Sequence, residues 1–340
     1  MAMKIKDIAK VAGVSTATVS NVINGNHNKV SEETIKRVMQ IVEENDYNPS
    51  ATARSLARKE SKIIGVVMPN LAPDEPFSIS PYYTQILAML EKYVRTKGYY
   101  LMVRSVGKCA EIVPVFSTWN VDGMIILGAF RDEVPELEDK LKKVPTVYID
   151  TYASDLNIAN IGIDDYKGGY LAARYLMGKG HREIAFVGPN VDSPGVIKQR
   201  FKGFSDALAE KNIQITADNI FESLTMFEQG VEAGRKVAFS KKKFTAVVSM
   251  SDILAFGVME GLKLSGLKVP DDISVIGFDN LPECRYSNPQ LTTVSQNLEK
   301  KAHDAGDALF RMIESKEMIS VNEIVDVEIV ERQSVREVYN

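Results

Sequence analysis

Short apolar runs alternate with helical patterns through most of the chain after Ser61. Few polar residues interrupt these runs, which is typical of strands that are buried on both faces of a parallel sheet. The runs span residues 63–68, 100–103, 124–127 and 147–149 in a first set, and 161–163, 184–187, 246–249 and 273–278 in a second set. This alternation predicts two consecutive parallel α/β lobes.

The last part of the chain is expected to cross between these lobes. A strand at Leu291–Val294 is followed by one more helix and one more strand, which suit crossovers that lead back from one lobe to the other. We therefore expect lobe one to comprise about 61–160 plus 295–323, and lobe two about 161–292 plus 324–336.

A different pattern occupies the N-terminus, where residues 9–25 predict two short helices joined by a sharp turn. Gly13 allows the turn, and Ser15 can cap a second helix whose inner face is apolar. Short side chains then face outward near the start of this helix, namely Thr16, Ala17, Ser20 and Asn21. A helix-turn-helix presents such side chains to base edges in the major groove. An ordinary helical hairpin would share part of this pattern.

Two further segments complete the N-terminal region. Apolar residues at helical spacing after Ser31 predict a third helix that closes a small core. Pro49 ends the helical segment before it. The segment that follows Pro49 has too few apolar residues to form a stable helix alone. These patterns divide the chain into an all-α head at 1–48, a linker at 49–60 and a larger α/β body at 61–340.

Two motifs in this region resemble those of the lac-repressor family of bacterial transcription regulators. Asp7 through Asn24 match the first family motif, and Tyr47 through Leu56 match the second in the correct order. The resemblance runs through essentially the whole chain, and it implies a DNA-binding head at 1–48, a hinge helix or linker at 49–60, and an effector-binding and dimerisation body at 61–340. It implies that the second motif is a hinge helix that pairs with its copy in a dimer and inserts Leu56 into the minor groove. The residues expected at the DNA are Thr16, Ala17, Ser20, Asn21, Asn24, Ala53, Arg54 and Leu56.

One departure from the family pattern bears on the operator sequence. Asn21 stands where family members commonly carry an arginine. Arginine can form two hydrogen bonds with guanine, whereas the shorter asparagine matches adenine. We expect the half-site of the operator to tolerate or prefer adenine, or to show little preference, at the corresponding base.

The resemblance also implies a body similar to a periplasmic sugar-binding protein, with a small effector held between the lobes. Open α/β sheets bind ligands beyond the carboxyl ends of their strands. Arg200 lies in the family motif R-x-x-G-F and Asp279 in G-[YF]-D, and the matching residues of family members bind the effector. The expected effector-binding residues are Tyr82, Asp150, Arg200, Ser251, Asp252, Asp279 and Gln296. Carboxylate and guanidinium groups suit vicinal hydroxyls, so we expect a sugar or a sugar derivative.

Several of these polar residues have a second interpretation. Asp150 and Asp252 could cap the helices that follow them. Asp164 and Asp165 are expected to cap the next helix rather than to bind a ligand. Tyr82 could stack on a sugar face or merely pack against its neighbours.

Charge is distributed unevenly along the 340 residues. The whole chain has a formal net charge of −4, yet residues 1–60 hold nine Lys and Arg against seven Asp and Glu. A modestly basic head on an acidic body suits a few phosphate contacts rather than a broad basic surface. The expected partners are a pseudo-palindromic double-stranded DNA operator, a small effector and a second copy of the chain.

The signals of several other protein classes are missing from the sequence. There is neither an apolar signal region nor a stretch of membrane length, so we expect a cytoplasmic protein without a membrane partner. The three histidines lack the spacing of metal ligands, so we expect no metal site. Neither a dinucleotide-binding fingerprint nor a G-x-S-x-G motif occurs, so we expect no cofactor and no enzyme activity. Because no leucine-heptad tail follows the last strand, a dimer is favoured over a tail-made tetramer. The alternatives are a regulator controlled by a phosphorylated carrier protein and a solute-binding protein.

Overall fold

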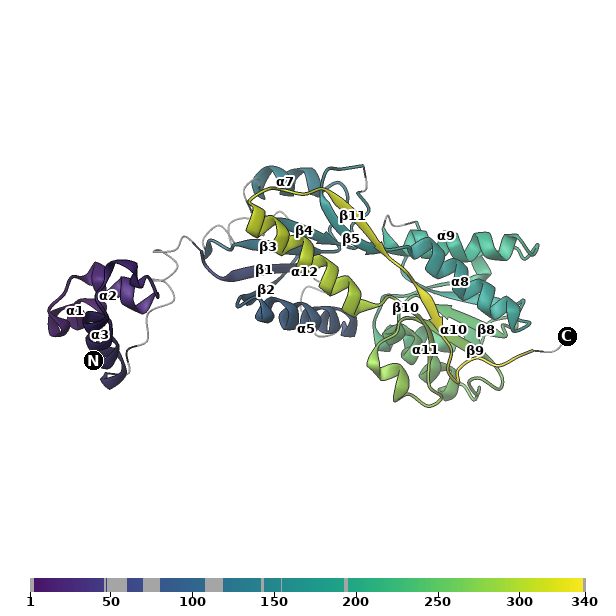
Figure 1. Cartoon of the computed structure of the whole chain (residues 1–340). Coiled ribbons are helices and arrows are strands. Elements are labelled where there is room, and N and C mark those ends of the chain that lie inside the picture. Colours follow the sequence, from purple (N-terminus) through teal and green to yellow (C-terminus); the bar gives the residue numbers. More distant parts are fainter. Residues whose placement is uncertain are drawn as a thin grey trace. The chain divides into compact units, whose positions relative to one another are not determined.

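The computed structural model of the chain describes residues 3–45, 47, 60–69, 80–107, 119–141, 144–153, 155–192 and 195–338. The chain forms two compact units, Met1–Lys62 and Ile63–Asn340, and Figure 1 shows the elements of both. Three of the residues expected at the DNA, Ala53, Arg54 and Leu56, lie outside the described residues. No helix within the described ranges is both long and apolar enough to cross a membrane.

The first unit is a small helical domain with the predicted helix-turn-helix. Gly13, in the left-handed conformation at φ 65°, ends the first helix, and the Oγ of Ser15 caps the second by accepting from the Thr18 amide at 3.0 Å. The core consists of small and branched residues: Ile8, Ala9, Ala12, Val19, Val22, Val38 and Ile41. The helices are α1 (Ile5–Ala12), α2 (Thr16–Ile23), the short η1 (His27–Lys29) and α3 (Glu32–Glu44).

Among its described residues, the second unit has two six-stranded sheets, one in each predicted lobe. The first sheet is fully parallel, in the order β11-β5-β4-β3-β1-β2. Its strands are β1 (Ile63–Pro69), β2 (Tyr100–Val106), β3 (Gly123–Leu127), β4 (Thr146–Ile149), β5 (Ala159–Ile163) and β11 (Val321–Val325). Helices cover both faces, with α5 (Pro81–Thr96) and α12 (Leu298–Ser315) on one face and α7 (Val134–Leu141) on the other.

The second sheet has the order β12-β10-β9-β8-β6-β7 and is parallel except for its edge strand β12. Its strands are β6 (Ile184–Gly188), β7 (Ile220–Glu222), β8 (Ala246–Ser249), β9 (Ser274–Asp279), β10 (Thr292–Ser295) and β12 (Glu328–Val330). Its helices are α8 (Asp165–Gly178) and α9 (Val196–Ala209) on one face, and α10 (Phe227–Ala238) and α11 (Asp252–Leu264) on the other. Two short turns, η4 (Ala217–Asn219) and η5 (Pro282–Arg285), complete the lobe.

Strand β5 corrects one expectation from the sequence. The alternating pattern assigned residues 161–163 to the start of lobe two, but β5 lies between β4 and β11 in the first sheet. The chain passes into lobe two only after this strand, where α8 begins. An apolar strand carries no local mark of the sheet in which it pairs, so the sequence pattern could not locate this crossover.

Within the described chain, three segments cross between the lobes, namely β5 to α8, β10 to α12, and β11 to β12. The long helix α12 returns from the second sheet and packs on the first, against α5 and against β3 to β5. Side chains on either side of these crossovers can therefore meet between the carboxyl ends of the two sheets.

Glycines hold the paired helices of lobe two unusually close together. A Cβ at Gly169 in α8 would lie 1.9 Å from the carbonyl oxygen of Arg200 in α9, and one at Gly203 would lie 1.9 Å from the carbonyl oxygen of Tyr166. The same arrangement recurs between α10 and α11, where a Cβ at Gly257 would lie 2.1 Å from the carbonyl oxygen of Phe227. Only glycine permits this approach of two backbones.

Candidate effector site and recognition helix

Helix α2 turns its short polar side chains away from the core of the head. Val19 and Val22 are buried, whereas Thr16 and Ala17 near the start of the helix are exposed. Ser20 and Asn21 are half-buried. This is the face that the sequence assigned to base contacts.

The fifth residue expected on this helix, Asn24, takes part in closing its end. Its Nδ2 donates to the carbonyl oxygen of Ser20 at 2.8 Å and to the Ser20 Oγ at 3.2 Å. Asn24 is also the C-terminal capping residue of α2. Its amide therefore already bonds to the last turn of the helix, and a contact between Asn24 and DNA stays a prediction.

A chain of polar side chains joins the two lobes at the carboxyl ends of their sheets. Tyr82 in α5 donates its hydroxyl proton to Asp150 Oδ2, and Asp150 directly follows β4. The Nζ of Lys301 in α12 donates to Asp150 Oδ1 at 2.8 Å and to Gln296 Oε1 at 2.7 Å. Gln296 follows β10 of lobe two, and its Nε2 donates to Oδ1 of Asp279 at the end of β9. We call these five residues the interlobe network.

Both carboxylates of the interlobe network have unusual backbone conformations. Asp150 has φ 58° and Asp279 has φ 127°, a region that residues with a side chain seldom adopt. Such strain is retained mainly where the surrounding structure holds a side chain in a required place, and it clusters at ligand-binding sites.

Burial raises the pKa of two groups in the interlobe network. Burial, together with the nearby carboxylate of Asp252, raises the pKa of the Asp279 carboxyl to about 8, against the opposing effect of Arg200. The pKa of the Tyr82 hydroxyl lies well above its usual value because desolvation disfavours its charged form and the Asp150 carboxylate lies beside it. Lys301 has no exposed surface, so its ammonium depends entirely on its protein partners for charge compensation.

A second polar group lies around Arg200, which α9 contributes. Its Nε donates to Asp165 Oδ1 at 2.7 Å, and its Nη1 donates to the carbonyl oxygen of Met250 at 2.8 Å. The guanidinium carbon stands 3.6 Å from the centre of the Phe278 ring, a close cation–π contact. Tyr152 donates its hydroxyl proton to the other oxygen of Asp165. Burial raises the pKa of Asp165, although the charge of Arg200 opposes this.

Ser251 and Asp252 are both engaged at the start of α11. The Oγ of Ser251 caps the helix by accepting from the Leu254 amide at 3.3 Å. Asp252 is completely buried, and its Oδ2 accepts from the Leu281 amide at 2.8 Å and from Cys284 Sγ at 3.1 Å. Its Oδ1 accepts from the hydroxyl of Thr293. These bonds tie α11 to β10 and to the segment after β9, and a contact between either residue and an effector stays a prediction.

The effector-binding residues expected from the sequence did not include three polar side chains of these two groups, namely Lys301, Asp165 and Tyr152. Asp164 caps α8 as expected, accepting from the Lys167 amide at 2.8 Å, but Asp165 points inward to Arg200 instead. Lys301 lies on the apolar side of α12, between the buried residues Leu298 and Ala302. A lysine within an apolar stripe was the signal that could have identified it.

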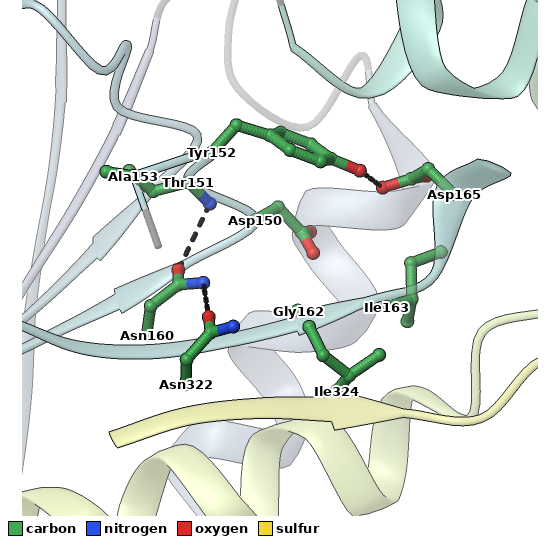
Figure 2. A pocket seen from close by; sticks show the side chains of 10 residues that line it. All are labelled: Asp150, Thr151, Tyr152, Ala153, Asn160, Gly162, Ile163, Asp165, Asn322 and Ile324. Atoms are coloured by element: carbon green, nitrogen blue, oxygen red, sulfur yellow. Dashed lines mark hydrogen bonds between the residues drawn. The ribbon is translucent and has the colours of Figure 1, made fainter. Parts of the chain in front are cut away.

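A small cavity adjoins the interlobe network at Asp150. Figure 2 shows it between the loop after β4 and the strands β5 and β11. Its volume is about 160 Å³, and its polar lining residues include Asp150, Asp165, Thr151 and Asn322. Asp150 therefore belongs both to the bridge between the lobes and to the wall of this cavity.

Two family models match separate parts of the chain. Residues 4–50 match bacterial regulatory proteins of the lacI family, and residues 173–335 match a periplasmic binding protein-like domain. The HTH-type transcriptional repressor PurR of Histophilus somni (strain 129Pt) is 33% identical, over 98% of this chain and 98% of its own length. A PurR repressor of Vibrio campbellii is also 33% identical, over 92% of each chain.

Solved structures agree with these sequence matches. A lac repressor dimer bound to operator and the anti-inducer ONPF is 26% identical, with a TM-score of 0.86 over 99% of this chain and 100% of that one. A LacI family transcriptional regulator from Enterococcus faecium with bound ribose is 25% identical, with a TM-score of 0.71 over 82% of this chain and 100% of that one. The head, the two-lobed body and the sequence matches over nearly the full length lead to one assignment: the chain belongs to the lacI family of bacterial regulatory proteins.

Proposed function

We propose that this chain is a cytoplasmic, sequence-specific transcriptional repressor that binds a pseudo-palindromic DNA operator as a homodimer and has no enzyme activity. Residues 1–48 form the DNA-binding head, 49–60 the hinge, and 61–340 the body that binds the effector and forms the dimer. The capped helix-turn-helix and the outward polar face of α2 support the role of the head. Relatives that are 33% identical over nearly the whole length are named as repressors, and the similar lac repressor was solved as a dimer on its operator.

The effector is a small polar molecule, such as a sugar or a sugar derivative, that binds between the lobes. The interlobe network is the observation that carries this proposal. Its polar side chains come from both lobes and lie together at the carboxyl ends of the strands of the two sheets. The effector contacts are assigned to Tyr82, Asp150, Arg200, Ser251, Asp252, Asp279 and Gln296, with Asp165 and Lys301 added from the structure.

Effector binding controls the operator through the angle between the lobes. A ligand that bonds to Asp150 or to Gln296 competes with the bonds these groups make to Lys301, and so it changes how strongly the lobes hold each other. The affinities for DNA and effector are then reciprocally coupled, typically by about 1 to 3 kcal/mol.

The experiment is an anisotropy titration of the purified protein with a labelled palindromic operator found by in vitro selection. It is run at one salt concentration, alone and with each member of a panel of sugars, sugar alcohols and sugar phosphates. Specific binding that one panel member shifts supports the proposal. Failure of selection to enrich any palindrome would refute the repressor function. A shift that appears only with a phosphorylated carrier protein would refute the small-molecule effector.

A further inference from the structure

The ammonium of Lys301 is enclosed by three acceptors. The side chain has no exposed surface, and its Nζ donates to Asp150 Oδ1 at 2.8 Å and to Gln296 Oε1 at 2.7 Å. The hydroxyl oxygen of Tyr82 is a third acceptor at 3.4 Å. An ammonium has three protons, so each of them has a partner. We call the acceptors Tyr82, Asp150 and Gln296 the ammonium cage.

The ammonium cage has the construction of a ligand site. Its side chains come from separate segments, since Tyr82 lies in α5, Asp150 follows β4 and Gln296 follows β10. They converge beyond the carboxyl ends of the strands, where open α/β sheets bind small molecules. The group that they hold, however, belongs to the chain itself, as part of α12.

The chemistry of the cage selects a cation. The Asp150 carboxylate compensates the positive charge, and the other two acceptors are neutral oxygens. The centre of the Tyr82 ring lies 5.5 Å from Nζ, within the range of a cation–π contact. A neutral hydroxyl group in the place of the ammonium would leave Asp150 without a counter-charge.

The position of Lys301 gives its ammonium an advantage over any free molecule. The Asp150 side chain is 14% exposed, so a small molecule can reach it from outside, whereas Lys301 approaches it from the buried side. A tethered group loses no translational freedom on binding and is present at a high effective concentration. The bond between Lys301 and Gln296 also spans the crossover from β10 to α12.

We propose that Lys301 is an internal ligand, whose ammonium fills the cage and fixes the crossover after β10 while no effector is bound. An effector then reaches Asp150 or Gln296 only by displacing this ammonium. The proposal rests on the proposed function of the cleft, to which it adds a built-in competitor.

Chemical rescue of a truncated lysine tests the proposal on the full-length protein. Lys301→Ala removes the side chain beyond Cβ, and the heavy atoms removed are those of propylammonium. The emptied cage keeps its acceptors, so propylammonium at roughly ten times its dissociation constant should raise the Tm of this variant by about 2 to 4 °C. Propan-1-ol and propionate, a neutral and an anionic probe of similar size, should not raise it at the same ionic strength. No saturable rise with propylammonium, or an equal rise with propan-1-ol, overturns the proposal.

Two control variants locate the rescue. Lys301→Met keeps the length of the side chain without its charge and leaves no room for the probe. Lys300→Ala truncates the neighbouring lysine, which is half-exposed and pairs with Asp304 at the surface of α12. A gain from propylammonium in either control equal to that of Lys301→Ala overturns the proposal. If Lys301→Ala does not stay folded alone, the yield of folded protein after refolding in each probe replaces Tm, with the same expected order.

Hydrogen exchange separates an internal ligand from an ion pair that only adds stability. In Lys301→Met, amide exchange at residues 295–301 should be about tenfold faster than in Lys300→Met, because the crossover has lost its fixed partner. Propylammonium should slow exchange there again in Lys301→Ala. A loss of protection spread evenly over both lobes would overturn the proposal. The operator titration contains no propylammonium, so failure of the rescue leaves the test of the repressor function intact.

Discussion

Lys301 donates to Asp150 Oδ1 at 2.8 Å although its side chain has no exposed surface, so a buried cation on α12 holds the carboxylate that follows β4. The same ammonium donates to Gln296 of the other lobe at 2.7 Å. A buried ion pair is expensive to break on one side, because the remaining charge loses its compensation. The bridge between the lobes therefore depends on this one lysine.

Lys301→Met keeps the apolar stem and removes the ammonium, and it should lower the free energy of unfolding by about 3 to 5 kcal/mol. Urea unfolding at neutral pH measures the loss. The neighbouring Lys300→Met is the matched control, because Lys300 is half-exposed and its ion pair with Asp304 lies at the surface of α12. Equal losses in the two variants would contradict the role assigned to Lys301.

Asp279→Asn should remove part of the pH dependence of stability. The pKa of this carboxyl is about 8 in the folded protein and about 4 in an unfolded chain. Between these values the unfolded chain releases the proton that the folded protein retains, so the free energy of unfolding falls as pH rises from about 4 to about 8. Urea unfolding at several pH values should show a shallower fall for Asp279→Asn. The other buried carboxylates are present in both proteins, so parallel pH profiles would refute the assignment.

Gly169→Ala should destabilise lobe two and displace Arg200. The added Cβ would meet the carbonyl oxygen of Arg200 at 1.9 Å, and a backbone atom can move only if the helices separate, so we expect a loss of about 1 to 3 kcal/mol. Gly178→Ala in the same helix is the control, since nothing lies within 4 Å of its added Cβ. Alanine there should be neutral or stabilising by up to about 1 kcal/mol. Thermal melts of both variants measure the difference in stability. Similar melting temperatures would show that α8 and α9 are not in close contact.

Asn21→Arg should change the base preference of the head. Asn21 is half-buried on α2, beside the exposed residues at the start of the helix. Arginine in its place should raise the preference for guanine by about 1 to 3 kcal/mol at one position of each half-site. In vitro selection of operators with both proteins at one salt concentration measures this. If the unchanged protein already selects guanine strongly there and the variant selects the same sequence, the register assigned to α2 is wrong.

Local signals made the head and the strand ends predictable from the sequence. The turn at Gly13 and the cap at Ser15 are each specified by residues within a few positions of one another. Asp150, Asp279 and Gln296 were predictable because polar residues that follow parallel strands collect at one edge of a sheet.

The sequence pattern could not predict which distant segments and side chains contact one another in the fold. The strand β5 reads like the first strand of lobe two, yet it pairs with β4 and β11 of lobe one. Asp165 resembles a second helix cap until the approach of α9 brings Arg200 to it. Lys301 becomes a bridge only because α12 packs beneath Asp150. In each case the partner lies many residues away, beyond the reach of a local pattern.

The glycine contacts between α8 and α9 and between α10 and α11 have a mechanical consequence. Where two backbones touch, there is no layer of side chains between them that could slide or repack under load. Each helix pair should then move as one rigid unit on its face of the second sheet. Elastic deformation would concentrate in the crossover segments, so lobe two would respond to a bound molecule by turning as a whole rather than by changing its own shape.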